Sequence, residues 1–193
     1  MSFRRITLNA TLDTMSRVKV TTIDEAITRL IAKLPKSSRP FFMVMSRVGH
    51  PITICCIAGV IVAIGLLQPT PITMLSGAFI WVAILISTVL KNTTKRSRPL
   101  TDYVAGMHIR SYSFPSGHTT GSTITFGLLA YYALHLLALP LGYFVLALAS
   151  FLILSIGVSR VYLGAHFPTD VIGGWMLGTT MLAIVIFVIR PLA

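Results

Sequence analysis

The sequence predicts an all-α integral-membrane helical bundle of about five transmembrane helices, preceded by an amphipathic helix at the membrane surface. Composition is the first reason. Of 193 residues, 54% are hydrophobic and 11% are charged, which is apolar even for a soluble domain with a large core. Hydropathy patterning is the second reason, because five runs without Asp, Glu, Lys or Arg approach the roughly 20 residues that a spanning helix needs. These runs cover residues 52–68, 70–90, 119–139, 140–158 and 171–189.

Two other classes of protein fit this composition less well. A soluble protein would need more polar surface than the uncharged runs leave to a chain of this length. The net charge of +11 is compatible with nucleic-acid binding, but the basic residues border the apolar runs and form no recognised nucleic-acid motif. Basic residues beside spans contact anionic lipid or set the topology. We therefore expect membrane lipids, and no nucleic acid, as partners.

The first element in chain order is a basic N-terminal segment over 1–49, which we expect to precede a membrane domain over 50–193. Residues 1–20 are polar, and they contain no secretory signal because no apolar core follows Arg4 and Arg5. Residues 22–34 predict an amphipathic helix, with a capping box formed by Thr22 and Glu25. This helix is too short and too charged to span, so we expect it in the interface or packed on the bundle. Its apolar face carries Ile23, Ile27, Leu30, Ile31 and Leu34, and its polar side carries Asp24, Glu25, Arg29 and Lys33.

The connectors between the apolar runs place most polar residues on one side of the membrane. Minimal turns are expected at 68–70 and 140–142, whereas the link over 91–117 is long. Long connections in compact folds are usually functional or disordered. Because consecutive spans alternate in direction, the N-terminal segment, this link and the connector over 159–170 share one face. That face carries all of the 16 Lys and Arg residues except Arg190.

Three polar stretches on this face contain the residue types that hold a phosphate group without a metal. A phosphate needs positive charge and fixed donors around its non-bridging oxygens. Lys91, Arg98 and Arg160 supply charge, and an arginine fork binds two oxygens at once. Ser116 and Gly117 lie where the third span begins, and a helix start offers free backbone N–H groups to an anion. Ser116 is also a candidate side-chain cap for that helix.

Two histidines and one aspartate supply the reactive groups for the same hypothesis. A neutral imidazole is a competent nucleophile toward phosphorus when a partner fixes its tautomer. Asp170, four residues after His166, is expected to accept one N–H of that ring and leave the other nitrogen to attack. His118 is expected to protonate the leaving oxygen and then to activate water. We expect Pro168 in the first turn of the last helix, with Asp170 just inside it.

The remaining basic residues and histidines near the span ends receive ordinary interpretations. Lys95 and Arg96 fall outside the spacing of the phosphate-binding residues, so we expect them in solvent or against lipid. The other three histidines are expected to be hydrogen-bonded residues near span ends, as is common for polar aromatic side chains at the interface. These are His50, His108 and His135.

The three polar stretches together resemble the type 2 phosphatidic acid phosphatase family, also called lipid phosphate phosphatases. The family signature is a lysine, six residues and Arg-Pro, then Pro-Ser-Gly-His, then Ser-Arg, five residues, His, three residues and Asp. All three blocks are complete, in order and correctly placed against the spans, and the resemblance covers residues 52–193. The blocks here are Lys91 with Arg98-Pro99, Pro115 to His118, and Ser159-Arg160 with His166 and Asp170.

This resemblance implies a helical bundle with one site at the membrane surface. It implies hydrolysis of a lipid phosphate monoester or diphosphate through a phosphohistidine, with no metal and no cofactor. His166 matches the nucleophile, Asp170 the residue that orients it and His118 the acid. The candidate substrates are phosphatidic acid, phosphatidylglycerophosphate and isoprenyl diphosphates. The matched phosphate-binding positions are Lys91, Arg98, Ser116, Gly117 and Arg160.

Two other functions remain open for the same set of residues. One is a phosphotransferase that passes the phosphoryl group to another lipid instead of water. The other is a non-catalytic lipid binder or transporter that retains a phosphate pocket.

The family resemblance also bears on the side of the membrane that the site faces. Six spans are common in the family and this sequence predicts five, with the missing span expected before Thr22. Its loss, with the N-terminus kept inside, would turn the site toward the cytoplasm. The charge bias of 15 to 1, or 12 to 1 without Lys91, Arg98 and Arg160, points the same way. We expect a bacterial plasma-membrane protein with a cytoplasm-facing site.

Overall fold

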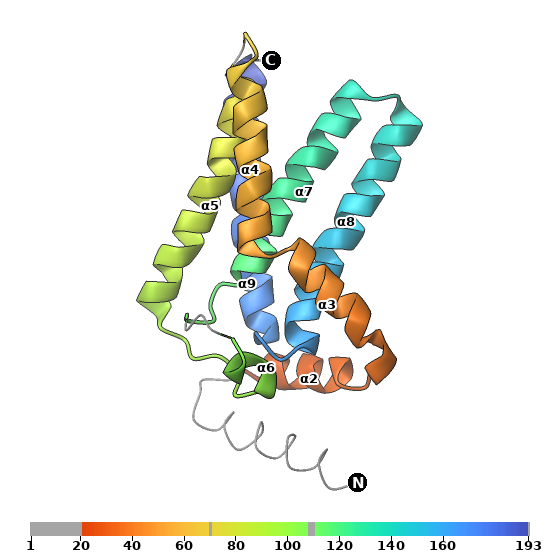
Figure 1. The fold of residues 1–193 in the computed structure, drawn as a ribbon, viewed down its shortest axis with the longest axis vertical. Coiled ribbons are helices and arrows are strands. Elements are labelled where there is room, and N and C mark those ends of the chain that lie inside the picture. The colour runs from red at the N-terminus through yellow and green to blue at the C-terminus, as the bar shows by residue number, and fades with distance from the viewer. Residues whose placement is uncertain (1–20, 70, 108–110, 193) are drawn as a thin grey trace, which may run out of the picture.

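A computed structural model describes residues 21–69, 71–107 and 111–192, and the regular structure of this part is helical (Figure 1). The expected polar segment over 1–20 and His108 lie outside the described residues. The longer helices are α2 Thr22–Ile31, α3 Arg39–Val48, α4 Pro51–Leu66, α5 Ile72–Thr94, α7 Gly117–Leu136, α8 Leu139–Tyr162 and α9 Pro168–Ile189. Three short pieces complete them: η1 Lys36–Ser38, α6 Asp102–Ala105 and η2 Arg190–Leu192.

The helices confirm an all-α membrane protein but do not confirm five spans. Only α5, α8 and α9 of the described helices are both long and apolar enough to cross a bilayer by themselves. Helix α4 has 16 residues and forms a fourth span only together with the segment 36–48, from which it is bent by 42°. Helix α7 has 20 residues, but its first two turns are mostly polar, and this lowers its mean hydropathy.

The polar turns of α7 are buried because they pack against glycines of α9. Gly174 and Gly178 form a G-x-x-x-G pattern, in which two small residues one turn apart allow helix backbones to approach closely. A Cβ atom added to Gly178 would lie 2.6 Å from the Thr123 Cβ, and one added to Gly174 would lie 2.8 Å from the Ser116 carbonyl oxygen. This close contact brings the N-terminal ends of α7 and α9 side by side, and both ends carry residues of the expected site.

Helix α2 differs from the sequence prediction in its ends and in the position of one charge. It ends at Ile31, three residues before the expected end, and its cap is Thr21 with Asp24, not Thr22 with Glu25. Thr21 Oγ1 accepts the Asp24 N–H, and the Asp24 carboxylate accepts the Thr21 N–H, both at 3.2 Å. Asp24 was expected on the polar side, yet it is completely buried, so that prediction was wrong.

Helix α2 packs against α8 and α9, while part of its apolar face remains exposed at Ile23 and Leu30. Packing on the bundle, one of the two expected settings, is therefore confirmed, and a place in the membrane interface stays a prediction. The turn before α8 also differs from expectation. It lies at residues 137–138 and not at 140–142, because Pro140 fits the first turn of α8, where its missing N–H has no helical partner.

Candidate active site

The three polar stretches meet at one end of the bundle, where α5 and α8 end and α7 and α9 begin (Figure 1). The structure brings all of the sequence-predicted site residues to this end. Helices α2 and α6 lie at the same end, whereas the turn between α7 and α8 and the C-terminal part of α9 lie at the opposite end. A single site can therefore use all three stretches.

The loop between α8 and α9 is shaped to present His166. Helix α8 ends at Tyr162, and Gly164 adopts a left-handed conformation with φ of +70°, which favours glycine. The chain then turns back, and the N–H groups of Ala165 and His166 both donate to the Arg160 carbonyl, at 2.9 and 3.2 Å. Pro168 occupies the first turn of α9, as predicted.

Asp170 lies in the first turn of α9 and faces His166. Its Oδ2 accepts the Phe167 N–H at 2.9 Å and lies 3.4 Å from His166 Nδ1. This contact is within ion-pair distance, but Nδ1 has no hydrogen-bond partner among the described residues. Hydrogen bonds at catalytic sites are often long before substrate binds. Both side chains are buried. Asp170 thus faces one nitrogen of the ring, which is the arrangement expected from its spacing.

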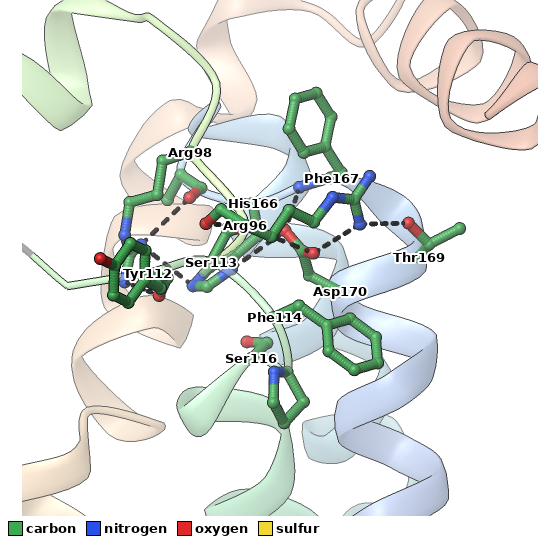
Figure 2. Close-up of polar contacts among 12 residues, drawn as sticks. Arg96, Arg98, Tyr112, Ser113, Phe114, Ser116, His166, Phe167, Thr169 and Asp170 are labelled. Carbon is green, nitrogen blue, oxygen red and sulfur yellow. Dashed lines mark hydrogen bonds and ion pairs between the residues drawn. The ribbon is translucent and has the colours of Figure 1, made fainter. Parts of the chain in front are cut away.

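The other nitrogen of His166 faces Arg98. Arg98 Nη1 lies 3.1 Å from His166 Nε2 (Figure 2). A guanidinium has only donors, so Nε2 of a neutral ring accepts here and the ring proton resides on Nδ1, toward Asp170. The pKa of His166 lies well below its ordinary value because of burial first, and then because of the positive charges of Arg98, Arg160 and Lys91. The ring is therefore neutral near pH 7, with a lone pair on Nε2.

Arg98 is itself fixed by the loop that precedes α7. Its Nε donates to the Ser111 carbonyl at 2.8 Å and its Nη2 donates to Ser111 Oγ at 2.9 Å. Its Nη1 also donates to the Ala165 carbonyl at 3.1 Å. These contacts hold the planar guanidinium against the His166 loop, and the side chain keeps part of its surface exposed.

Lys91 reaches the start of α7 from α5. Its Nζ donates to the Pro115 carbonyl, beside the first residues of that helix. A Cβ atom added to Gly117 would lie 3.8 Å from Lys91 Cε and from Ser87 Oγ. These are ordinary contact distances, so packing within the described structure does not require glycine at this position.

Ser116 occupies the N-cap position of α7 but does not cap it through its side chain, so the expected side-chain cap was wrong. Its Oγ instead accepts from Thr119 Oγ1 at 3.0 Å, and its N–H donates to the Asp170 carbonyl at 2.9 Å. The first N–H groups of a helix lack partners within the helix. The start of α7 thus retains its donors close to Lys91, and Ser116 ties it to the start of α9.

Arg160 and His118 carry buried polar atoms that have no partner among the described protein atoms. The Arg160 side chain is 1% exposed. Its Nη1 donates to Ser46 Oγ and lies 3.4 Å from the Tyr103 hydroxyl, whereas its Nε and Nη2 have no such partner. His118 Nε2 is also buried without one. Buried polar groups are normally paired, so these donors are suited to a ligand.

His50 lies against His118, and no sequence signal indicated this contact. The two rings meet edge to face with centroids 5.4 Å apart. His50 caps α4, where its Nδ1 accepts the Ile52 N–H at 3.2 Å. That bond leaves the proton of a neutral His50 ring on Nε2.

Arg96 contradicts its sequence-based interpretation, whereas Lys95 is exposed as expected. Arg96 donates to Asp170 Oδ1 and to Asp24 Oδ2, each at 2.7 Å, and Figure 2 shows it between Asp170 and Thr169. Its guanidinium also lies 4.7 Å from the centre of the Phe167 ring. No sequence signal identified this role, because Arg96 and Asp24 are 72 residues apart in the chain.

A cleft of about 860 Å³ opens beside Arg98, a volume within the range of small-molecule sites. The loops around α6 form its walls. Arg98 therefore borders both the cleft and the buried His166. The lining residues include Arg98, Thr101, Asp102, Met107, Ser111 and Tyr112.

Fold and site together define an integral membrane protein with a buried histidine–carboxylate pair and several arginines at one end of a helical bundle. The PAP2 superfamily model matches residues 72–191. The chain therefore belongs to the PAP2 superfamily.

Individual relatives agree with this membership. Phosphatidylglycerophosphatase B of Bacillus subtilis is 37% identical over 103 residues, which cover 52% of this chain and 50% of that protein. Undecaprenyl-diphosphatase of Sulfolobus acidocaldarius is 32% identical over 106 residues, which cover 51% of this chain and 46% of that protein. The chain thus spans about half the length of these relatives.

The fold also matches a solved structure. The crystal structure of a transmembrane PAP2-type phosphatidylglycerolphosphate phosphatase from Bacillus subtilis superposes with a TM-score of 0.74 at 24% sequence identity. The superposition covers 100% of this chain and 98% of that one. At this level of identity, the likeness shows the fold.

Proposed function

We propose that this protein is a membrane phosphatase that hydrolyses lipid phosphate monoesters or diphosphates through a phosphohistidine intermediate. The single observation that carries the proposal is the His166 ring held between Asp170 and Arg98. Asp170 lies on the Nδ1 side at 3.4 Å and Arg98 on the Nε2 side at 3.1 Å. A neutral ring with a fixed tautomer and a phosphate-binding cation at its reactive nitrogen is suited to attack on phosphorus.

In the proposed first step, Nε2 of His166 forms a bond to phosphorus as the bond to the leaving oxygen breaks. His118 gives a proton to that oxygen, so the lipid leaves as an alcohol or a monophosphate. A bound phosphate favours the protonated form of His118, because an opposite charge nearby stabilises a cation. Asp170 stabilises the positive charge that develops on the His166 ring.

In the second step, water attacks the phosphohistidine and His118 takes its proton. The P–N bond breaks, inorganic phosphate leaves and His166 returns to its neutral form. Lys91, Arg98 and Arg160, together with the Ser116 hydroxyl and the Gly117 N–H, would hold the phosphoryl oxygens in both steps. The cleft beside Arg98 is the proposed path for water and phosphate.

Metal independence is part of the proposal. Among the described residues, no group of three His, Cys, Asp or Glu side chains is placed to hold a metal ion. The cationic side chains would instead supply the charge stabilisation that a metal gives in other phosphatases.

The apolar tail of the substrate would lie between helices. A groove of about 520 Å³ is lined by residues of α7, α8 and α9, including Gly127, Ile153, Trp175 and Leu182. It extends from the second turn of α7 toward the opposite end of the bundle. Three related proteins are named for phosphatidylglycerophosphate, undecaprenyl diphosphate and lipid A 1-phosphate. These lipids differ in their tails and share a phosphate group, which supports a lipid phosphate as the substrate class.

The test is phosphate release by purified protein in detergent with excess chelator. The substrates would be phosphatidic acid, phosphatidylglycerophosphate and an isoprenyl diphosphate, and His166→Ala would be the matched variant. Chelator-resistant release that the variant abolishes is the expected result. Release that stops with chelator would overturn metal independence. If folded protein releases no phosphate from any of these lipids, hydrolysis of these lipids is excluded and phosphoryl transfer or lipid binding becomes the favoured function.

We further propose that the protein lies in a bacterial plasma membrane with its site facing the cytoplasm. The segments expected on the same side as the site carry all Lys and Arg residues except Arg190, and such an excess is typical of the cytoplasmic side. The test uses Ala10→Cys and Ala105→Cys singly, each in a chain whose Cys55 and Cys56 are replaced by serine. A membrane-impermeant thiol reagent should label neither variant in intact cells and both in opened cells. Labelling of both in intact cells would overturn the orientation.

A further inference from the structure

Arg96 joins two buried carboxylates that come from different parts of the chain. Its Nη1 donates to Asp170 Oδ1 and its Nη2 donates to Asp24 Oδ2, both at 2.7 Å. Both carboxylates are 0% exposed, and the arginine side chain is 16% exposed. Such short two-armed contacts are among the stronger charge-assisted hydrogen bonds and fix both distance and direction.

Asp24 also completes the first turn of α9, although it belongs to α2. Its Oδ1 accepts from the Thr169 N–H and from Thr169 Oγ1, each at 2.8 Å. Pro168 has no N–H, and the cap residue Phe167 has no side-chain acceptor, so α9 has no local side-chain cap for Thr169. A carboxylate at this position also interacts favourably with the helix dipole. Asp24 therefore holds the turn that carries Asp170.

The Arg96 guanidinium lies between two buried carboxylates of like charge. Two buried carboxylates near each other disfavour ionisation of one of them. The guanidinium between them opposes this repulsion and favours a negative charge on Asp170 opposite His166. Burial acts to raise the pKa of Asp24, but hydrogen bonds from Thr169, Arg96 and Thr21 outweigh it and hold that pKa below its usual value.

We propose that Asp24 and Arg96 are positioning residues of the reaction, which hold Asp170 ionised and oriented toward Nδ1 of His166. The inference rests on the proposed function of His166 as nucleophile. It assigns a catalytic contribution to α2, since Asp24 lies outside residues 72–191, over which the family model matches. Neither residue contacts the phosphate in this proposal, and both act through Asp170.

The kinetic test compares Asp24→Asn and Arg96→Ala with two controls on α2, Glu25→Gln and Arg29→Ala. Glu25 and Arg29 form an exposed ion pair, 3.1 Å apart. We expect kcat to fall about 10- to 100-fold in both test variants, as for other residues that orient a reactive group, with KM within about twofold. Both control variants should have the kcat and KM of the wild type. Unchanged kcat in folded Asp24→Asn would overturn the proposal.

Chemical rescue separates positioning from a merely structural role. Added methylguanidinium should restore part of kcat to Arg96→Ala and none to His166→Ala, because the cation can occupy the place between the two carboxylates. If Arg96→Ala does not fold, Asp24→Asn, which keeps the side-chain shape, decides the kinetic test alone. Folded Arg96→Ala that shows no rescue would count against the proposal.

A spectroscopic test does not depend on hydrolysis. The chain has five histidines, so ¹⁵N-histidine NMR can assign His166 by comparison with His166→Gln. We expect a neutral ring protonated on Nδ1 in the wild type and a mixture of tautomers in Asp24→Asn. If the wild type releases no phosphate but this shift occurs, the proposed function fails and the positioning role stands. An unchanged tautomer in Asp24→Asn overturns the positioning role even if the enzyme is active.

Discussion

Arg98 and His166 meet through the nitrogen that the proposed reaction uses. Arg98 Nη1 lies 3.1 Å from His166 Nε2, and the same Nη1 donates to the Ala165 carbonyl at 3.1 Å. A substrate phosphate must take over the N–H that points at Nε2 before Nε2 can attack, because Nη1 has two N–H groups and both are directed at these acceptors. The residue that binds the phosphate thus also controls access to the nucleophile.

The first prediction follows from the forked geometry of Arg98. Arg98→Lys keeps the charge but loses the planar fork that contacts Ser111, Ala165 and His166. We expect kcat/KM to fall by about 10²- to 10³-fold, the range for loss of one fixed donor to a transition state. Arg190→Lys, at the opposite end of the bundle, is the control and should not change kcat/KM. A fall of less than threefold for Arg98→Lys would remove Arg98 from the phosphate site.

The second prediction separates packing from ligand binding at two glycines. A methyl group at Gly117 would make only ordinary contacts, the nearest at 3.8 Å, whereas one at Gly178 would lie 2.6 Å from Thr123 Cβ. Gly117→Ala should therefore fold with an unchanged melting temperature. It should bind orthovanadate, a phosphate analogue, at least about tenfold more weakly, because the methyl group would keep the anion from the backbone N–H and one well-placed charge-assisted hydrogen bond is worth that much. Gly178→Ala should lose about 1–3 kcal/mol of stability through overpacking. Equal vanadate affinity in Gly117→Ala and the wild type would show that the anion does not approach the start of α7.

The third prediction concerns pH and stability. Burial, followed by the charges of Arg98, Arg160 and Lys91, holds the pKa of folded His166 well below its ordinary value. The unfolded chain binds a proton at this residue below a pH of about 6.5 and the folded chain does not. Stability is therefore fully present above that pH and falls as the pH decreases toward the pKa of the folded state, by at most about 1.4 kcal/mol per pH unit.

The comparison that checks this prediction is thermal unfolding of wild type and His166→Gln between pH 7.5 and 5. The variant should lose less stability than the wild type as the pH falls, because glutamine does not titrate. Parallel curves for the two proteins would mean that His166 titrates normally in the folded state.

The fourth prediction is that Arg160 lowers stability in exchange for ligand binding. Two of its nitrogens are buried without a protein partner among the described residues, and each such group costs about 1–3 kcal/mol. Arg160→Met has similar length and no charge, so its melting temperature without ligand should equal or exceed that of the wild type. Orthovanadate should raise the melting temperature of the wild type but not that of Arg160→Met. A lower melting temperature without ligand would assign Arg160 a structural role.

The sequence predicts the local parts of the site well. The spacing from His166 to Asp170 sets both on one loop and one helix start, and Pro168 marks that start without reference to any distant residue. The alternating directions of the helices place the three motif stretches at one end of the bundle, and helix packing brings them together. These predictions depend on neighbours along the chain and on membrane topology, which are both visible in the sequence.

The contacts between distant residues could not be predicted in the same way. Asp24 and Glu25 are adjacent carboxylates near a helix start, and only the packing of α2 on α9 determines which one is buried. Arg96 has the composition of a solvent-exposed residue until Asp24 and Asp170 lie on either side of it. Helix α7 shows the same limit, because its Thr and Ser residues reduce its apparent apolarity and are buried by the Gly174 and Gly178 face of α9.

The contact between Asp24 and the start of α9 also limits how this chain can be divided. The expected boundary between residues 49 and 50 separates Asp24 from Arg96 and Thr169, which bond to it directly. A fragment that begins at residue 50 would retain every signature residue but leave the guanidinium with one carboxylate and the Thr169 N–H without its acceptor. Chimeras that exchange the membrane bundle between relatives should therefore carry their own N-terminal helix with it.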